Sequence, residues 1–326
     1  MSPKISVIIP SYNAARFVAE AVASALGQTL PPLEVIVVDD GSTDETEAVL
    51  RSFGERIRHI RQPNGGPAVA RNRGIRESRG ELIAFLDADD VWLPEKLEKQ
   101  WRCLQNHQAA GLVHSNLLVW DDETGETTPG DDGRRERSGA CYGKLFTRSG
   151  VTPSTVLLKR ECLDRVGVFD ETIREASTED YDLFLRIARR YEFAFVDEPL
   201  ILYRRHAASA SHGRLKMMTN ELRVVRKALG ADPELPRLVG RRKVRERLHH
   251  LAFSIGYMHH DAGRSAEARE HFKMALANQP WRAYTLALYA INLLPPSWAG
   301  AMRRLKGGLS QRLRATPSAA GARPCR

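Results

Sequence analysis

Three carboxylates crowd the end of one apolar segment of this 326-residue sequence. Asp87, Asp89 and Asp90 follow the run Leu82–Leu86, whose composition is typical of a buried strand. Acids packed this closely repel one another unless a cation lies among them. Carboxylates suit Mg²⁺ or Mn²⁺, which usually takes its other ligands from water and substrate phosphates. The spacing therefore predicts a divalent metal and a phosphate-bearing substrate, in preference to a polar turn before a helix near Pro94.

Polar residues also follow two earlier apolar segments. Ile5–Ile9 leads into Pro10-Ser11-Tyr12-Asn13, and Glu34–Val38 leads into Asp39-Asp40-Gly41. The carboxyl ends of parallel strands lie on one edge of a sheet, which is where open α/β sheets bind ligands. A sheet with a purely structural role has no reason to collect these groups on one edge.

The elements that must position these residues alternate along the first hundred residues. Apolar runs predict strands at Ile5–Ile9, Glu34–Val38, Ile57–Ile60 and Leu82–Leu86, and helical spacing predicts helices at Phe17–Leu26, after Ser42 or Thr43, and at Ala68–Glu77. This order predicts an α/β fold with a mostly parallel sheet flanked by helices on both faces.

Residues 101–212 are expected to complete the same domain. Their pattern predicts strands at Leu112–Trp120, Ser154–Leu158, Phe193–Val196 and Leu200–Tyr203, helical segments at Glu161–Val166 and Glu179–Tyr191, and an exposed, mobile loop at 121–139. A catalytic domain at 1–212 follows from this reading.

The pattern changes to helix only from about Leu215. Within 251–280 it follows the helix–turn–helix pattern of a tetratricopeptide repeat, at Ile255-Gly256, Ala268, Phe272, Ala275 and Pro280. Ala252 and His259 depart from the pattern, and a single repeat cannot bury its apolar face alone. The sequence thus predicts an all-α region at 213–315 that packs on another surface, and a disordered tail at 316–326.

The net charge also changes sign near residue 210, where the helical region begins. The formal net charge is +9, but residues 1–210 carry −6 and residues 211–326 carry +15. The negative N-terminal part argues against a nucleic-acid substrate, whereas the basic C-terminal part suits an anionic membrane surface. Aromatic and aliphatic residues of Trp281–Trp298, flanked by Arg282 and Arg303-Arg304, suit the lipid interface, although they could equally cover the helical hairpin.

Composition places the chain among ordinary globular proteins, with 42% hydrophobic and 27% charged residues. No apolar run approaches the ~18 residues of a membrane span, and no signal-peptide layout precedes Ile5. The four cysteines form no metal-binding spacing and no disulfide framework. We expect a cytoplasmic protein, with an association at the inner face of the plasma membrane through its basic region.

Taken together, six motifs over residues 4–212 resemble glycosyltransferase family 2, the inverting enzymes with the GT-A fold. They are Val7-Ile8-Ile9-Pro10-Ser11-Tyr12-Asn13, Val38-Asp39-Asp40-Gly41-Ser42-Thr43-Asp44, Asn64-Gly65-Gly66-Pro67 with Ala70-Arg71-Asn72-Arg73-Gly74, Leu86-Asp87-Ala88-Asp89-Asp90, Glu179-Asp180-Tyr181-Asp182 and Tyr203-Arg204-Arg205-His206. The resemblance implies a hexosyltransferase-type enzyme with a nucleotide-diphosphate sugar donor, a UDP-sugar in the first instance.

The resemblance also implies roles for individual residues. The donor-binding residues would be Pro10, Tyr12, Asp39, Asp40, Arg71, Arg73 and Asp87, and the ligands of Mn²⁺ or Mg²⁺ would be Asp89, Asp87 and His206. Asp180 would be the base that deprotonates the acceptor hydroxyl, with Glu179 binding acceptor or supporting it. Both acids also suit a helix N-terminus, for which Ser177 and Thr178 are candidate caps.

The acceptor implied is a saccharide or a lipid-linked saccharide, as in bacterial surface polysaccharide or glycolipid synthesis. Two other functions compete with this one. A nucleotidyltransferase would place a glycine-rich, basic loop after the first strand, where this chain has Ser11-Tyr12-Asn13-Ala14-Ala15-Arg16. A non-catalytic scaffold acting through the helical region would have no need of the intact acid motifs. Neither Gly-x-Gly-x-x-Gly nor a Walker A loop is present.

Overall fold

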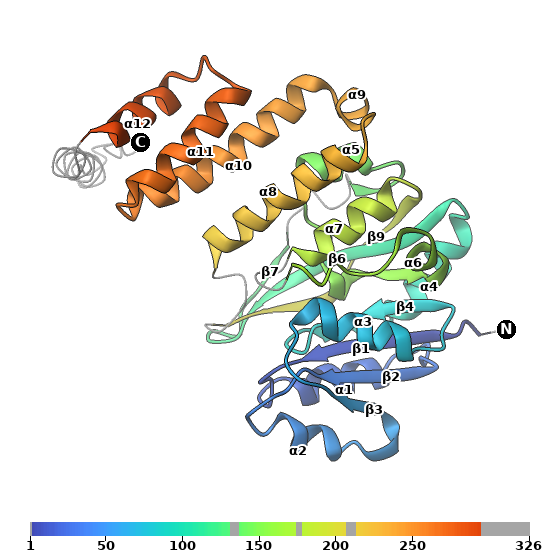
Figure 1. The fold of residues 1–326 in the computed structure, drawn as a ribbon. Coiled ribbons are helices and arrows are strands. Elements are labelled where there is room, and N and C mark those ends of the chain that lie inside the picture. The colour runs from blue at the N-terminus through green and yellow to red at the C-terminus, as the bar shows by residue number, and fades with distance from the viewer. Residues whose placement is uncertain (1, 131–136, 174–177, 207–212, 295–326) are drawn as a thin grey trace, which may run out of the picture. The chain divides into compact units, whose positions relative to one another are not determined.

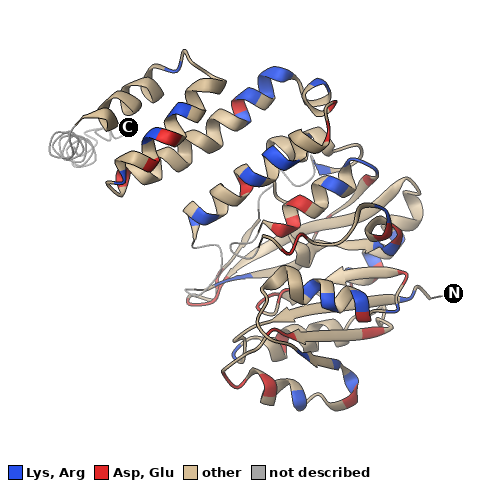
Figure 2. Cartoon of the chain, viewed as in Figure 1, with Lys and Arg blue, Asp and Glu red and all other residues tan. Residues whose placement is uncertain are grey.

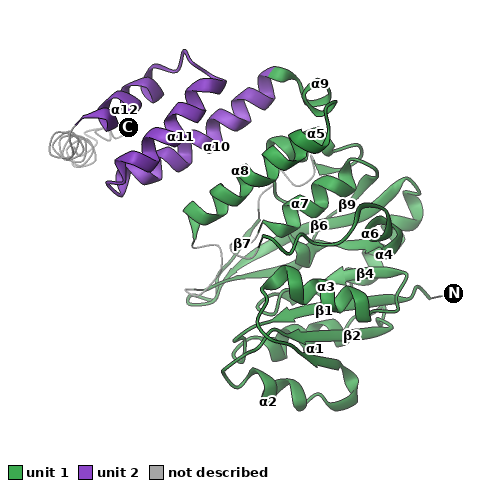
Figure 3. Ribbon diagram, viewed as in Figure 1, with its two compact units in different colours: residues 1–241 green, residues 242–326 purple. Residues whose placement is uncertain are grey.

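The chain divides into two compact units, Met1–Arg241 and Arg242–Arg326 (Figure 3). The computed structural model describes residues 2–130, 137–173, 178–206 and 213–294. The helices α8 (Arg214–Ala231) and α9 (Leu235–Val239) belong to the first unit. That unit therefore extends beyond the boundary at residue 212 that the sequence predicts, while the proposed tail at 316–326 lies outside the described residues.

The N-terminal half of the first unit alternates strands and helices (Figure 1). Its elements are β1 (Ile5–Ser11), α1 (Val18–Leu26), β2 (Glu34–Asp39), α2 (Thr46–Arg51), the short 3₁₀ helix η1 (Gly54–Arg56), β3 (Arg58–Arg61), α3 (Pro67–Glu77) and β4 (Leu82–Phe85). β1 pairs in parallel with β2 and β4, and β2 pairs in parallel with β3. This is the predicted βαβ arrangement, and it brings the ends of β1, β2 and β4 to one edge.

The second half makes the sheet mixed. Its elements are β5 (Val91–Trp92), α4 (Lys96–Asn106), β6 (Ala110–Asp121), β7 (Thr127–Pro129), α5 (Tyr142–Thr147), η3 (Pro153–Thr155), β8 (Leu157–Lys159), α6 (Arg160–Val166), α7 (Glu179–Ala188) and β9 (Glu192–Arg205). The strand order is β3-β2-β1-β4-β8-β6-β9-β5, with β7 paired to β6. β8 runs antiparallel to both β4 and β6, so the continuous series of parallel strands that begins at β3 ends at β4.

Three local predictions are wrong in detail. Residues 127–129, placed in a mobile loop, form β7 beside β6, and residues 131–136 lie outside the described part. The two strands predicted within 193–203 are one strand, β9, whose pairing with β6 continues through register shifts near Asn116. The predicted strand at 154–158 starts as η3, because Ser154 and Thr155 turn their polar groups to neighbouring loops.

Apolar side chains on both faces of the parallel strands bury the sheet. On one face, α1 and α4 pack against residues such as Val7 and Val37 in the main hydrophobic core. On the other face, α3 lies so close to β1 that a Cβ on Gly74 would approach Ile8 within 2.3 Å. The fully buried strands explain why their sequences read as continuous apolar runs.

The second unit contains α10 (Arg241–Asp261), α11 (Ser265–Asn278) and α12 (Ala283–Leu293). The predicted hairpin is present as α10 and α11, with Gly256 against the ring of Phe272, where a Cβ would lie 2.9 Å from Cδ1. Leu288 of α12 completes this small core with Ala268 and Phe272. Among the described helices, none combines the length and apolar character required to cross a bilayer.

Candidate active site

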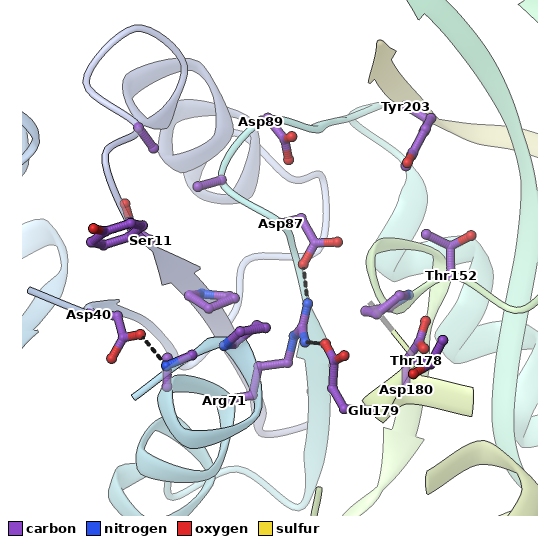
Figure 4. A pocket seen from close by; sticks show the side chains of 18 of the residues that line it. Ser11, Asp40, Arg71, Asp87, Asp89, Thr152, Thr178, Glu179, Asp180 and Tyr203 are labelled. Atoms are coloured by element: carbon purple, nitrogen blue, oxygen red, sulfur yellow. Dashed lines mark hydrogen bonds and ion pairs between the residues drawn. The ribbon is translucent and has the colours of Figure 1, made fainter. Parts of the chain in front are cut away.

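A cleft of about 730 Å³ opens at the carboxyl ends of β1, β2 and β4 (Figure 4). It collects residues from all six sequence motifs, together with residues from η3 and α8. The residues that line it are Pro10, Ser11, Tyr12, Asn13, Ala14, Phe17, Asp40, Asn64, Gly66, Pro67, Ala70, Arg71, Asp87, Ala88, Asp89, Ser149, Gly150, Val151, Thr152, Pro153, Thr178, Glu179, Asp180, Tyr181, Tyr203, His206, Met217 and Glu221.

One end of the cleft is formed by the loops after β1 and β2. The ring of Tyr12 is 51% exposed there, which leaves its face available to a planar ligand. Asp40 is buried, and its carboxylate accepts hydrogen bonds from the backbone N–H groups of Gly65 (3.0 Å) and Gly66 (2.7 Å) and from Gln62 Nε2 (2.7 Å). Asp40 therefore holds the loop before α3 against this end of the cleft.

Two of the residues predicted to bind donor do not line the cleft. Asp39 is fully buried beneath it, where Oδ1 accepts the backbone N–H of Ser42 at 2.9 Å. Arg73 lies on the exposed side of α3, where its guanidinium pairs with Glu77 at 3.0 Å. Of each neighbouring pair, therefore, only Asp40 and Arg71 line the cleft, a distinction that the motifs alone do not make.

The acid loop, residues 87–90, is held from behind at several points. Ser154 Oγ donates to Asp90 Oδ2 (2.6 Å) and accepts the backbone N–H of Asp87 (3.0 Å). The backbone N–H of Arg204 donates to Asp90 Oδ1 at 3.1 Å. Asp90 is buried, and burial together with the charges of Asp89 and Asp87 raises its pKa well above the usual range. Asp90 therefore orients the loop and does not cap α4.

Asp89 and His206 form the part of the cleft that suits a cation. Asp89 Oδ2 lies 3.1 Å from His206 Nε2, and burial and the nearby charge of Asp87 raise the pKa of Asp89. A neighbouring like charge disfavours the ionised form of a carboxylate, and a divalent cation bound between the carboxylate and the imidazole would stabilise that form. No group of three or more acidic, His or Cys side chains in the described ranges is arranged as a complete metal site. The pair fits a metal that takes its other ligands from water and phosphate.

Arg71 joins the two acid motifs (Figure 4). Its guanidinium donates to Asp87 Oδ1 at 2.6 Å and to Glu179 Oε1 at 2.5 Å, and it is 4% exposed. The charges of these two carboxylates outweigh burial and raise the Arg71 pKa, so the residue stays a cation. The bridge holds the end of β4 and the start of α7 together across the floor of the cleft.

Asp180 is the carboxylate next to this bridge. It lies in the first turn of α7, on the wall of the cleft, with Thr178 at the N-cap position. Burial, followed by the charge of Glu179, raises the pKa of Asp180 well above the usual range, and Arg71 opposes the shift. Asp180 thus lies both at a helix N-terminus and on the wall of the cleft, while the candidate cap Ser177 lies outside the described residues.

Several residues of the site carried no clear signal in the sequence. Ser154 comes from a segment that reads as an ordinary strand, Thr152 precedes that segment, and Glu221 comes from α8, beyond every motif. Arg204 belongs to the motif Tyr203-Arg204-Arg205-His206, in which the family resemblance implies a role for His206 alone. Trp92, for which both an acceptor-side and a core role are open in the sequence, is buried and donates from Nε1 to the Ser154 carbonyl (2.9 Å), so it belongs to the core.

Comparisons with known proteins agree with this geometry. Residues 6–167 match the model of glycosyl transferase family 2. An uncharacterised glycosyltransferase of Rickettsia prowazekii is 34% identical over 221 residues, covering 67% of this chain and 69% of its own length. TuaG of Bacillus subtilis, named as a teichuronic acid biosynthesis glycosyltransferase, is 43% identical over 163 residues, covering 49% of this chain and 63% of its own.

Two solved structures share the fold at low sequence identity. Residues 1–349 of TarS from S. aureus, in complex with UDP-GlcNAc, align with a TM-score of 0.58 at 17% identity, covering 89% of this chain and 90% of that one. The mannosyltransferase PcManGT from Pyrobaculum calidifontis, in complex with GDP-Man and Mn²⁺, aligns with a TM-score of 0.58 at 20% identity, covering 96% and 88%.

Proposed function

Because the chain belongs to glycosyltransferase family 2 and has the GT-A fold, we propose that it is a metal-dependent, inverting hexosyltransferase that uses a nucleotide-diphosphate sugar. The observation that carries the proposal is the single cleft in which Asp89 and Asp180 both lie. Arg71 bonds between their neighbours, Asp87 and Glu179, and so fixes the distance between the two acid motifs.

The donor would lie along the ends of β1, β2 and β4. Tyr12 offers a ring face to a nucleobase beside Pro10, and Asp40 shapes that end by holding the loop at Gly65 and Gly66. The diphosphate would lie toward Asp89 and His206, which would hold the metal, with Asp87 beside them. A bound Mn²⁺ or Mg²⁺ would neutralise the charge of the leaving nucleoside diphosphate.

Asp180 is positioned to act on the acceptor. In its deprotonated form it accepts the proton of the acceptor hydroxyl while that oxygen forms a bond to the anomeric carbon. The bond from this carbon to the diphosphate oxygen breaks on the opposite side, and the nucleoside diphosphate leaves with the bonding electrons. Glu179 bonds to Arg71, so its role is to support the base, and the single displacement inverts the anomeric configuration.

We expect nucleotide-sugar binding to require the metal, because the metal would link Asp89 to the diphosphate and Asn at this position would be a much weaker ligand. A thermal-shift screen of UDP-, GDP- and dTDP-sugars with Mn²⁺ should identify a donor, since ligand at a hundredfold its Kd adds ~2.7 kcal/mol of stability. EDTA should abolish that shift, and Asp89→Asn should reproduce the effect of EDTA. The exposed Asp164→Asn is the control that should bind as wild type does. Donor binding that is unchanged in EDTA and in Asp89→Asn would exclude the metal role.

The relatives narrow the substrates to be tried first. The TarS structure contains UDP-GlcNAc and the PcManGT structure contains GDP-Man with Mn²⁺, so UDP-sugars and GDP-sugars are the first donors. TuaG is named for teichuronic acid biosynthesis, which favours a saccharide or lipid-linked saccharide acceptor of the bacterial surface. The enzyme would then act in the cytoplasm, at the inner face of the plasma membrane.

The second unit supports this location through an apolar surface on α12. Leu288 and Tyr289 pack on the helical hairpin, but Trp281, Leu286 and Leu293 are more than half exposed. Residues 283–294 include no Lys, Arg, Asp or Glu, as the uniformly tan α12 shows in Figure 2. Some apolar residues of Trp281–Trp298 therefore cover the helical hairpin, but others are left exposed to solvent. Residues 295–298 of this segment lie outside the described part of the chain.

We expect the full-length protein to float with anionic vesicles at low salt and to dissociate as salt rises, because each basic residue near the surface contributes ~1 kcal/mol. Leu286→Glu should abolish flotation by placing a charge in the apolar surface. The matched control is Leu238→Glu on α9, which changes an equally exposed leucine of the first unit. Equal flotation of the two variants, or a wild type that stays unbound at low salt, would leave the second unit as a protein-binding module.

A further inference from the structure

Arg204 is a buried arginine at the end of β9, behind the acid loop. Only 5% of its surface is exposed, although a guanidinium carries a full charge. Burying such a group is costly unless every donor finds a partner. The contacts that satisfy Arg204 therefore show what the residue does.

Two of these contacts hold the acid loop directly. Arg204 Nε donates to the backbone carbonyl of Asp89 at 2.9 Å, and its backbone N–H donates to Asp90 Oδ1 at 3.1 Å. One residue thus holds the main chain at Asp89 and the side chain of the next residue. The backbone of Asp89, from which the carboxylate extends toward His206, cannot shift without breaking one of these bonds.

The remaining contacts fix the guanidinium itself. NH1 donates to Asp122 Oδ1 at 2.7 Å, and NH2 donates to the carboxylate of Glu20 on α1. The guanidinium also stacks on the ring of Trp120, 3.9 Å from its centroid, and lies 5.1 Å from the centroid of Phe17. Its position is therefore set by α1, by the end of β6 and by the loop after β1.

These partners also cancel the charge of Arg204. Asp122 and Glu20 both pair with it, so the guanidinium has little net charge left to offset the acids of the loop. Its effect on Asp89 is then geometric. A lysine would retain the charge but has neither the planar group that stacks nor the fork that donates in three directions.

We propose that Arg204 is a positioning residue that holds Asp89 in the geometry needed to bind a divalent cation together with a nucleoside diphosphate. The proposal rests on the proposed function, because it assumes that this cation site exists. Residues that orient a metal ligand from behind typically change metal affinity ~10–100-fold when they are replaced. Arg204 would then set the cation affinity of the site while touching neither the cation nor the nucleotide.

The test is the concentration of Mn²⁺ that gives half-maximal binding of UDP, with GDP and dTDP in parallel, measured by isothermal titration without any acceptor. We expect Arg204→Lys to raise this concentration ~10-fold or more, with binding restored at saturating Mn²⁺. Glu20→Gln loosens one anchor of the guanidinium and should shift the concentration in the same direction by less. It also carries the test if Arg204→Lys fails to fold.

The matched control is Arg160→Lys, since Arg160 also donates several bonds, to Gly80 and Ser78, at the opposite end of β4. It should lower the thermal stability but leave the half-maximal Mn²⁺ concentration unchanged. A folded Arg204→Lys or Glu20→Gln with the wild-type Mn²⁺ requirement overturns the role of Arg204 and leaves the proposed function standing. A wild type that binds none of the three nucleotides with Mn²⁺ overturns the proposed function, and the role of Arg204 with it.

Discussion

Replacing Asp180 with asparagine is expected to lower turnover by ~10²–10⁴-fold and to leave nucleotide-sugar binding intact. The substitution removes the group that we propose as the acceptor of the hydroxyl proton but retains the size of the side chain at the cleft wall. In the proposed arrangement the donor lies along the ends of β1, β2 and β4, whereas Asp180 lies in the first turn of α7. Parallel measurements of turnover and of donor Kd should therefore separate the two effects.

The pH profile of the wild type gives a second readout of the same prediction. Burial and the charge of Glu179 raise the pKa of Asp180, and the base must be deprotonated to act. Activity should therefore fall as the pH decreases through this raised pKa, at a higher pH than for an ordinary aspartate. The residual activity of Asp180→Asn should lack that acid limb. If this variant turns over as wild type does, Glu179 becomes the candidate base.

Replacing Arg71 with methionine should have the largest effect on stability. The substitution leaves Asp87 and the buried Glu179 without the guanidinium that bonds to both. Removing one partner of a buried ion pair typically costs ~3–5 kcal/mol. We expect the free energy of unfolding from urea titration to fall by about that amount, and transfer to be lost because the two acid motifs separate.

Arg73→Met is the matched control on the same helix. Arg73 is about half exposed and pairs with Glu77 one turn away, so its loss should change stability by no more than ~0.5 kcal/mol. The family resemblance implies a donor-binding role for both arginines, but of the two only Arg71 lines the cleft. Equal losses of stability in the two variants would show that the Arg71 bridge contributes nothing beyond a surface pair.

The parts of the site that could be predicted are those in which chemistry and strand ends coincide. Asp87, Asp89 and Asp90 follow a fully buried strand, and their mutual repulsion indicates a shared function before any coordinates are known. Glu179 and Asp180 begin the helix α7 and follow no strand, so the sequence indicates them as a pair only through the family resemblance. The alternation of strands and helices over residues 5–86 also determined which edge of the sheet would collect these groups.

The remaining features depend on pairings between residues far apart in the sequence. Nothing local distinguishes Asp39, which turns inward to the Ser42 backbone, from Asp40, which holds Gly65 and Gly66. Ser154 acts on the acid loop because β8 runs antiparallel beside β4, a pairing that no periodicity reveals. Arg204 reaches Asp89 because β9 pairs antiparallel with β5, which directly follows the acid loop, and Val91 lies opposite Leu202. Long-range register sets these contacts, and a single sequence does not encode it in a readable form.

The most direct test of the account is the identity of the product formed from the donor. The wild type would be incubated with Mn²⁺, a panel of UDP-, GDP- and dTDP-sugars and a lipid-linked saccharide extract of bacterial membranes, and the nucleotide products would be separated by chromatography. We expect one donor to yield its nucleoside diphosphate in equal amount to the sugar transferred, and EDTA to stop the reaction. Release of pyrophosphate would identify a nucleotidyltransferase instead, and the absence of any product from every donor would contradict the assignment of a catalytic role.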